Sequence, residues 1–222
     1  MTWLRHSWPQ VLELGLAHLA LALPAIALSV LLAVPLGWLA SSYPRLGGPL
    51  ATVTSLLYAV PALPLLIVVP VVLGVPLRSA TTVVTALTVY GVALMVRSAS
   101  DAFASVDATA RAGAVAVGHS RGSLFWRVEL PLATPVLVAG LRVVSVSTVC
   151  LVTIGALVGV SSLGTLLTDG FQRGIVAEVA TGVLGTCLLA VLLDVLWLAL
   201  GRAATPWTRA GSARLRVRRA AR

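Results

Sequence analysis

Residues 107–135 read DATARAGAVAVGHSRGSLFWRVELPLATP, and the contrast between this stretch and the regions on either side of it decides the fold class. It is the longest polar interruption between apolar runs in a chain of 222 residues that is 59% hydrophobic and only 10% charged. A soluble domain of this size carries about a quarter charged residues. The stretch therefore separates two parts of a chain whose composition is typical of a membrane protein.

The apolar parts consist of long runs that contain almost no charge. Four runs of 18 to 32 residues contain no Asp, Glu, Lys or Arg, and a fifth run of 23 residues contains one acid, Asp194. A spanning helix needs about 20 predominantly apolar residues, and backbone polar groups in lipid must be satisfied within the helix. We therefore expect an all-α, polytopic membrane protein with about five transmembrane helices. The expected spans are 14–40, 50–74, 79–96, 136–160 and 179–201.

The arginines orient these spans, because all 16 basic residues of the chain are Arg. With the amino terminus outside, 3 arginines fall on the outer side and 13 on the inner side, as the positive-inside rule requires. We expect a bacterial cytoplasmic membrane protein whose transmembrane domain, residues 1–204, includes a cytoplasmic loop at 97–135. Residues 205–222 form a basic cytoplasmic tail, which indicates a topology anchor near anionic lipid rather than a nucleic-acid-binding arm.

The cytoplasmic loop contains the signals of two short helices. Asp107 can cap a helix that consists almost only of Ala, Gly and Val, and Gly118 is placed where a left-handed residue favourably ends it. Ser120 can cap a second helix, and Pro131 and Pro135 are expected to interrupt or kink the chain behind it. Such a pair of helices fits a groove in another protein, or is a plain surface hairpin that joins two spans. Shape alone leaves both interpretations open.

The spacing of the loop resembles a motif of ABC-importer permeases. Gly118, nine residues and then Val-Glu-Leu-Pro at 128–131 is similar to their "EAA" loop, whose pattern is E-A-A-three-G-nine-I-x-L-P. The resemblance implies a coupling helix that docks on a cytoplasmic ATPase. The glutamate of the motif falls on Ala112 here, so any salt bridge made by that glutamate is absent, and Arg111 and Arg121 are the nearest charges that could substitute. The residues that the resemblance assigns to coupling are Asp107, Arg111, Ala112, Gly113, Ala114, Gly118, Arg121, Val128, Leu130 and Pro131.

Other stretches resemble one subfamily, the permeases for osmoprotectants such as glycine betaine, carnitine and choline. They are TSLLYAVPALPLL at 54–66, DAFASVDATARAGAVAVGHS at 101–120, the region 128–171, and DVLWLALGRAATPW at 194–207. The resemblance implies the type I ABC-importer permease fold, like that of methionine importers. It also implies a second permease subunit, identical or paralogous, a dimer of ATP-binding subunits and an extracytoplasmic solute-binding protein.

The sequence shows no energy source of its own. A phosphate-binding GxxxxGK[ST] loop is impossible without Lys, and no intramembrane chain of acids and histidines suits a proton relay. We therefore expect that ATP and Mg are bound by the partner ATPase and that this chain binds no cofactor. His6, His18 and His119 lack metal-ligand spacing, and seven scattered acids do not suit a membrane-embedded enzyme. An importer of another small solute, such as an amino acid, remains the alternative.

Further residues are candidates for the transport pathway. Prolines in the second span could open backbone carbonyls toward a cavity, and two tyrosine rings could attract a quaternary ammonium, although kinks and packing are ordinary alternatives. A Gly/Ser-rich loop closes the fourth span on the outer side, where a plain turn is the alternative. The pathway candidates are Tyr58, Pro61, Pro64, Tyr90, Gly159, Ser161, Ser162 and Gly164. Arg142 and Asp194 are expected to pair structurally between the fourth and fifth spans, because unpaired charges at membrane depth are costly.

Overall fold

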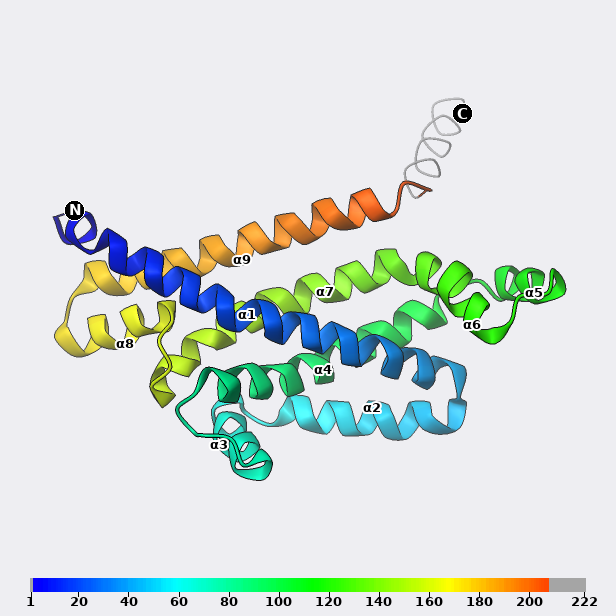
Figure 1. The fold of residues 1–222 in the computed structure, drawn as a ribbon, viewed down its shortest axis with the longest axis horizontal. Coiled ribbons are helices and arrows are strands. Elements are labelled where there is room, and N and C mark those ends of the chain that lie inside the picture. Colours follow the sequence, from blue (N-terminus) through cyan, green and yellow to red (C-terminus); the bar gives the residue numbers. More distant parts are fainter. Residues whose placement is uncertain (1, 208–222) are drawn as a thin grey trace, which may run out of the picture.

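The computed structural model describes residues 2–207, and within them every regular element is a helix (Figure 1). The elements are α1 (Thr2–Ser42), α2 (Pro44–Ala59), α3 (Ala62–Leu73), α4 (Ala80–Ala104), α5 (Ala108–Ala116), α6 (Arg121–Leu124), the π-helical η1 (Phe125–Glu129), α7 (Leu130–Val152), the 3₁₀-helical η2 (Thr153–Val158), α8 (Leu163–Arg173) and α9 (Val176–Ala204). Most of the expected basic tail, residues 208–222, lies outside the described residues.

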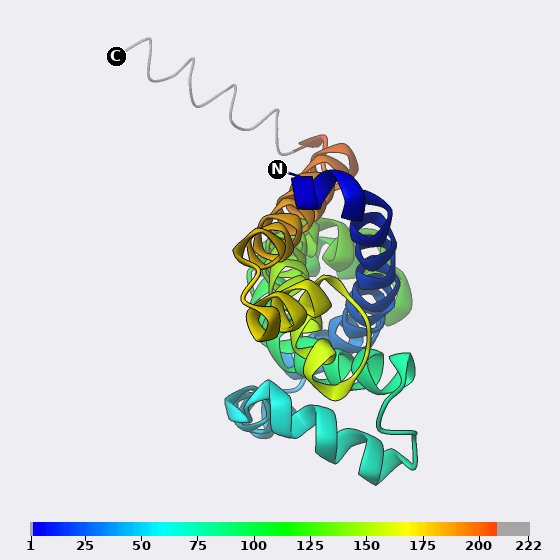
Figure 2. The ribbon, with the colours of Figure 1, turned by 90° about the vertical axis from the view of Figure 1, so that its left-hand side faces the viewer.

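The long helices form an elongated bundle with two different ends. The α1–α2 turn, the α5–α6 pair and the last turns of α9 lie at one end (Figure 1), and we name it the coupling end. The start of α1, α8 and η2 lie at the opposite end, which faces the viewer in Figure 2. At the coupling end, α5 projects beyond the long helices (Figure 1).

Four helical segments in the described part of the chain are long and apolar enough to cross a membrane. They are Ser7–Ser42, Ala80–Ala104, Arg121–Val158 and Val176–Ala204. A fifth candidate is the pair Arg45–Ala59 and Ala62–Leu73, which is bent by 111°. The prediction of an all-helical protein with about five spans is thus confirmed, with the second span broken rather than straight.

The break in the second span follows from Pro61. Proline disfavours the α conformation in the residue before it, and Val60 accordingly adopts φ −70° and ψ 126°. Pro61 itself is extended, with φ −59° and ψ 142°, and α3 begins directly after it. The kink expected from the prolines is therefore a sharp bend of 111° between two separate helices.

Small residues let the long helices approach closely. A Cβ atom on Gly91 of α4 would collide with Ser29 of α1, and one on Gly140 of α7 would lie 2.6 Å from the Cβ of Ser98 on α4. Such contacts matter in a membrane, where helices associate through packing because lipid is as apolar as the helix surface. The α1–α4–α7 core therefore depends on glycine at its crossings.

Polar contacts join several of the helices inside the bundle. Arg142 and Asp194, which were expected to pair, form a bidentate ion pair between α7 and α9, with both N–O distances 2.7 Å. His18 of α1 is fully buried, and its Nε2 donates to the carbonyl of Val149 at 3.0 Å. That carbonyl is available because the N–H of Thr153 bonds to Cys150 and Leu151 where α7 changes to 3₁₀ geometry.

Candidate functional site

The expected first helix of the loop is α5, and its ends are built as the sequence predicts. Asp107 accepts hydrogen bonds from the backbone N–H and the hydroxyl of Thr109, both at 2.8 Å. These bonds, the backbone one first, hold the pKa of the Asp107 carboxyl below its usual value, so the cap stays ionised at neutral pH and weakens only on acidification. Gly118 follows the last turn with φ +91°, in the left-handed region that favours glycine.

Apart from Arg111, the surface of α5 consists of small side chains that are not buried. None of its residues is buried, and a Cβ atom built on Gly113 or on Gly118 would meet no other atom within 4 Å. Val115 on α5 and Val117 directly after it are exposed apolar side chains, and Ala112, the position of the missing glutamate, is exposed as well. A partner protein that packs against this helix would therefore contact its backbone and small side chains.

A buried carboxylate anchors α5 to the bundle. Glu129 of η1 is only 6% exposed, and its Oε1 accepts from the Nε of Arg111 at 2.7 Å. Its Oε2 accepts from the Nε1 of Trp38 on α1, also at 2.7 Å. The Nη2 of Arg111 additionally donates to the carbonyl of Phe103 on α4. We name Trp38, Arg111 and Glu129 the anchor triad, since it joins α5 to α1, α4 and η1.

The anchor triad changes the role expected for Arg111. The sequence offered Arg111 as a charge that could substitute for the missing glutamate on the docking surface. In the structure, its guanidinium instead bonds to Glu129 and to the carbonyl of Phe103 at the base of the loop. Glu129 and Trp38 were not among the predicted site residues. A charged side chain beside a membrane span needs a partner, so the Glu inside the apolar run VELPL was the available signal.

The second helix of the loop differs from the prediction. Ser120 caps α6 as expected, by accepting from the N–H of Ser123 at 3.4 Å. Of the interruption or kink expected at Pro131 and Pro135, the interruption is wrong, because residues 121–158 form one continuous helical segment. A π turn at 125–129 precedes Pro131, and the N–H of Leu130 bonds to Phe125. The wider turn accommodates a proline, which has no N–H for an α-helical bond to Arg127.

The remaining predicted coupling residues lie around this continuous helix. Val128 and Leu130 are half-buried, and Leu130 packs on a core cluster that includes Phe103 and Ala133. The Nη1 of Arg121 donates to the hydroxyl of Tyr43 at 3.3 Å. These positions therefore form the base of the loop rather than its exposed tip.

The structure brings two of the predicted pathway residues together. The rings of Tyr58, near the end of α2, and Tyr90, in α4, have centroids 5.2 Å apart and are tilted by 42°. Tyr58 is 49% exposed, so one ring of the pair is open to a ligand or a partner. Pro61 lies at the break that follows Tyr58, and Pro64 is exposed in the first turn of α3.

The predicted outer loop divides into exposed and packed positions. Gly159 and Ser161 are exposed, and Gly159 has φ +83°. Ser162 is fully buried and caps α8 in a capping box with Thr165. A Cβ atom on Gly164 would collide with the carbonyl of Thr153. Ser162 and Gly164 thus have evident structural roles in holding α8 against η2.

Comparisons with known proteins place these features in a family. The family described as binding-protein-dependent transport system inner membrane component matches residues 29–210. The chain is 30% identical over 197 residues to the glycine betaine/carnitine/choline transport system permease protein OpuCD of Bacillus subtilis, which covers 88% of this chain and 85% of the relative. It is 31% identical over 195 residues to the osmoprotectant import permease protein OsmW of Salmonella typhimurium, covering 84% of this chain and 86% of the relative.

A solved structure shows the same fold. An inward-facing structure of the MetNI methionine ABC transporter matches with a TM-score of 0.77 and 20% identity, covering 88% of this chain and 97% of the matched one. This match agrees with the methionine-importer-like fold expected from the sequence. The chain therefore belongs to the family of binding-protein-dependent transport system inner membrane components, and it is a non-catalytic, multi-pass permease subunit of an ABC importer.

Proposed function

We propose that this chain imports osmoprotectants such as glycine betaine, choline and carnitine, as one of two permease subunits that enclose the pathway. The observation that carries the coupling part of this proposal is the geometry of α5. It is a capped, unburied helix that projects from one end of the bundle and is anchored to three other elements through Arg111 and Glu129 (Figure 1). An exposed element with a rigid base can receive force from a partner and pass it to the spans.

The proposed orientation places α5 in the cytoplasm and the amino terminus outside. The excess of arginines predicted for the inner side supports this assignment. A dimer of ATP-binding subunits then docks on the coupling end and binds ATP with Mg, while the extracytoplasmic binding protein delivers solute at the end that carries α8. Closure of the ATPase dimer would rock the two permease subunits against each other.

A second permease subunit, identical or paralogous, completes the pathway in this proposal. The broken span exposes large apolar side chains on both of its arms, among them Leu56, Ile67 and Val72. Five spans enclose little space alone, and two packed subunits form a pathway between them.

The solute assignment rests on the substrates for which the relatives are named and gains support from the tyrosine pair. Glycine betaine, choline and carnitine all carry a quaternary ammonium, which is attracted to aromatic ring faces by about 0.5–2 kcal/mol. Tyr58 and Tyr90 offer two such rings beside the break in the second span. An amino acid or a similar small solute is the second candidate, because the binding protein, rather than the permease, largely selects the solute.

Uptake into proteoliposomes tests this function. The chain is reconstituted with a candidate ATPase and a candidate binding protein, and entry of radiolabelled glycine betaine, choline and carnitine is followed with ATP inside. ATP-dependent uptake of at least one of the three is expected. Uptake of an amino acid but none of the three would overturn the osmoprotectant assignment and leave the permease role intact.

Replacing Tyr58 or Tyr90 by Ala is expected to lower the specificity constant for uptake by roughly 2- to 30-fold, the range of one lost cation–π contact. Phe at either position keeps the ring face and should retain most of the activity. The measurement is initial uptake at saturating binding protein. Equal losses in the Ala and Phe variants would assign the effect to the hydroxyl and contradict recognition by the ring face.

A further inference from the structure

Two cavities of opposite character adjoin at the coupling end. The first is an apolar groove of about 630 Å³ between α1, α7 and the α6–η1 segment, lined among others by Val34, Phe125, Trp126 and Leu141. The second is a polar cup of about 330 Å³, lined among others by Ser41, Ser42, Tyr43 and Glu129. Trp38 and Arg121 line both, so the groove and the cup open beside each other.

The cup contains two arginines, and only one of them, Arg111, is paired with a carboxylate. Glu129 neutralises Arg111 at 2.7 Å. Arg121 donates to the uncharged hydroxyl of Tyr43, and the ion pairs found among residues 2–207 do not include it. The cup therefore combines hydroxyl groups with a positive charge that an anion can balance.

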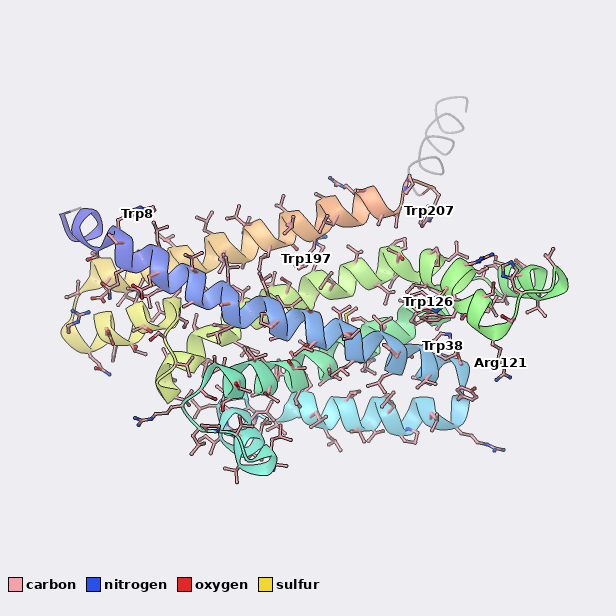
Figure 3. The ribbon with its side chains drawn as sticks, viewed as in Figure 1. Trp8, Trp38, Arg121, Trp126, Trp197 and Trp207 are labelled. Atoms are coloured by element: carbon pink, nitrogen blue, oxygen red, sulfur yellow. The ribbon has the colours of Figure 1, made fainter. Side chains whose placement is uncertain are left out.

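The groove lies where an acyl chain can enter it. Its walls come from α1 and α7, both of which belong to segments long and apolar enough to cross a membrane. Its volume falls within the range of about 300–1,000 Å³ typical of small-molecule sites. Trp38, Arg121 and Trp126 lie together near one end of the bundle (Figure 3), and tryptophan is enriched at the level of lipid headgroups.

We propose that the groove and the cup form one site for an anionic phospholipid of the cytoplasmic leaflet. An acyl chain occupies the groove, and the phosphate is bound by Arg121 and by the hydroxyls of Ser42 and Tyr43. The assignment to the cytoplasmic leaflet rests on the orientation given under the proposed function. A second permease subunit would also cover an apolar groove, but only an anionic headgroup is complementary to the charge of the adjoining cup.

The position of the site links the lipid to coupling. Two members of the anchor triad, Arg111 and Glu129, line the cup, and the third, Trp38, lines both cavities. A lipid bound there contacts the end of α1 and the base of the α5 loop at the same time. It therefore stiffens the connection through which movement of α5 would reach the spans.

Lipid retention by the purified chain tests the proposal. The protein is exchanged into nanodiscs of phosphatidylglycerol mixed with phosphatidylcholine, released, and examined by native mass spectrometry. The wild type is expected to retain phosphatidylglycerol in preference to phosphatidylcholine. Arg121→Gln should lower that preference roughly fivefold, since one arginine near an anionic surface contributes about 1 kcal/mol. Leu31→Trp, which fills the groove from an exposed position on α1, should reduce retention of both lipids.

Two matched variants control for changes in charge and size. Arg127→Gln removes a nearby exposed arginine that does not line the cavities, and Leu32→Trp places the same indole on the neighbouring exposed position outside the groove. Both should retain lipid as the wild type does. Unchanged preference in Arg121→Gln would overturn the site, and so would a loss of permease dimers in Leu31→Trp with no change in bound lipid. The measurement needs no ATPase or solute, so failed transport alone would leave its result valid.

Discussion

Replacing Gly118 by Trp is expected to reduce ATP-dependent uptake at least about tenfold, a loss equivalent to about 1.4 kcal/mol. Gly118 has φ +91°, a conformation that costs an L-residue with a side chain roughly 1–2 kcal/mol. The surroundings of its missing Cβ are open, so an indole there would project from the tip of α5 rather than disturb the bundle. The variant should insert normally and lose its association with the ATPase, which co-purification measures.

Gly174→Trp is the matched control for this prediction. Gly174 also has positive φ, +67°, and open surroundings, but it ends α8 at the opposite end of the molecule. Its indole should leave ATPase association unchanged. If Gly118→Trp keeps the ATPase and the uptake of the wild type, or if both variants lose the ATPase equally, α5 is not the docking element.

Replacing Glu129 by Ala is expected to uncouple ATP hydrolysis from uptake and to destabilise the chain by roughly 2–3 kcal/mol. The change leaves the indole N–H of Trp38 and the guanidinium of Arg111 without their carboxylate acceptor. The value lies below that of a fully buried ion pair because the Arg111 side chain is 31% exposed. Thermal unfolding in detergent measures the stability, and the ratio of solute imported to ATP hydrolysed measures the coupling.

Two further variants separate the anchor from general damage. Glu129→Gln keeps an acceptor for Trp38 and should lose less stability than Glu129→Ala. Asp101→Ala removes an exposed acid near the end of α4 and should change stability by no more than about 0.5 kcal/mol. A double-mutant cycle between Glu129→Ala and Arg111→Ala that gives purely additive losses would contradict the proposed ion-pair anchor.

The sequence predicts local features of this molecule well, because their signals lie within a few residues of each other. Asp107 and Ser120 cap helices where expected, and Gly118 adopts the left-handed conformation expected after α5. The Arg142–Asp194 pair was also predictable, although 52 residues separate its members, because two charges at membrane depth have few possible partners.

Features that depend on packing between distant segments could not be predicted in the same way. Trp38 and Glu129 are 91 residues apart, and nothing in either local pattern indicates their contact. The size of the bend after Val60 depends on the packing of α3 against α4 and η2, which are distant in sequence or follow it in the chain. Ser162 and Gly164 fit the general pattern of a flexible loop, and only the approach of η2 shows that both are packed.

Site-specific photo-cross-linking tests the coupling role of α5 most directly. A benzophenone amino acid replaces Val117, which is 81% exposed at the end of α5, and a second variant carries it at Val176, which is 79% exposed at the start of α9 at the opposite end. Illumination of the assembled transporter should join position 117 to the ATP-binding subunit and leave position 176 free of that adduct. An ATPase adduct at position 176 and none at position 117 would contradict the account.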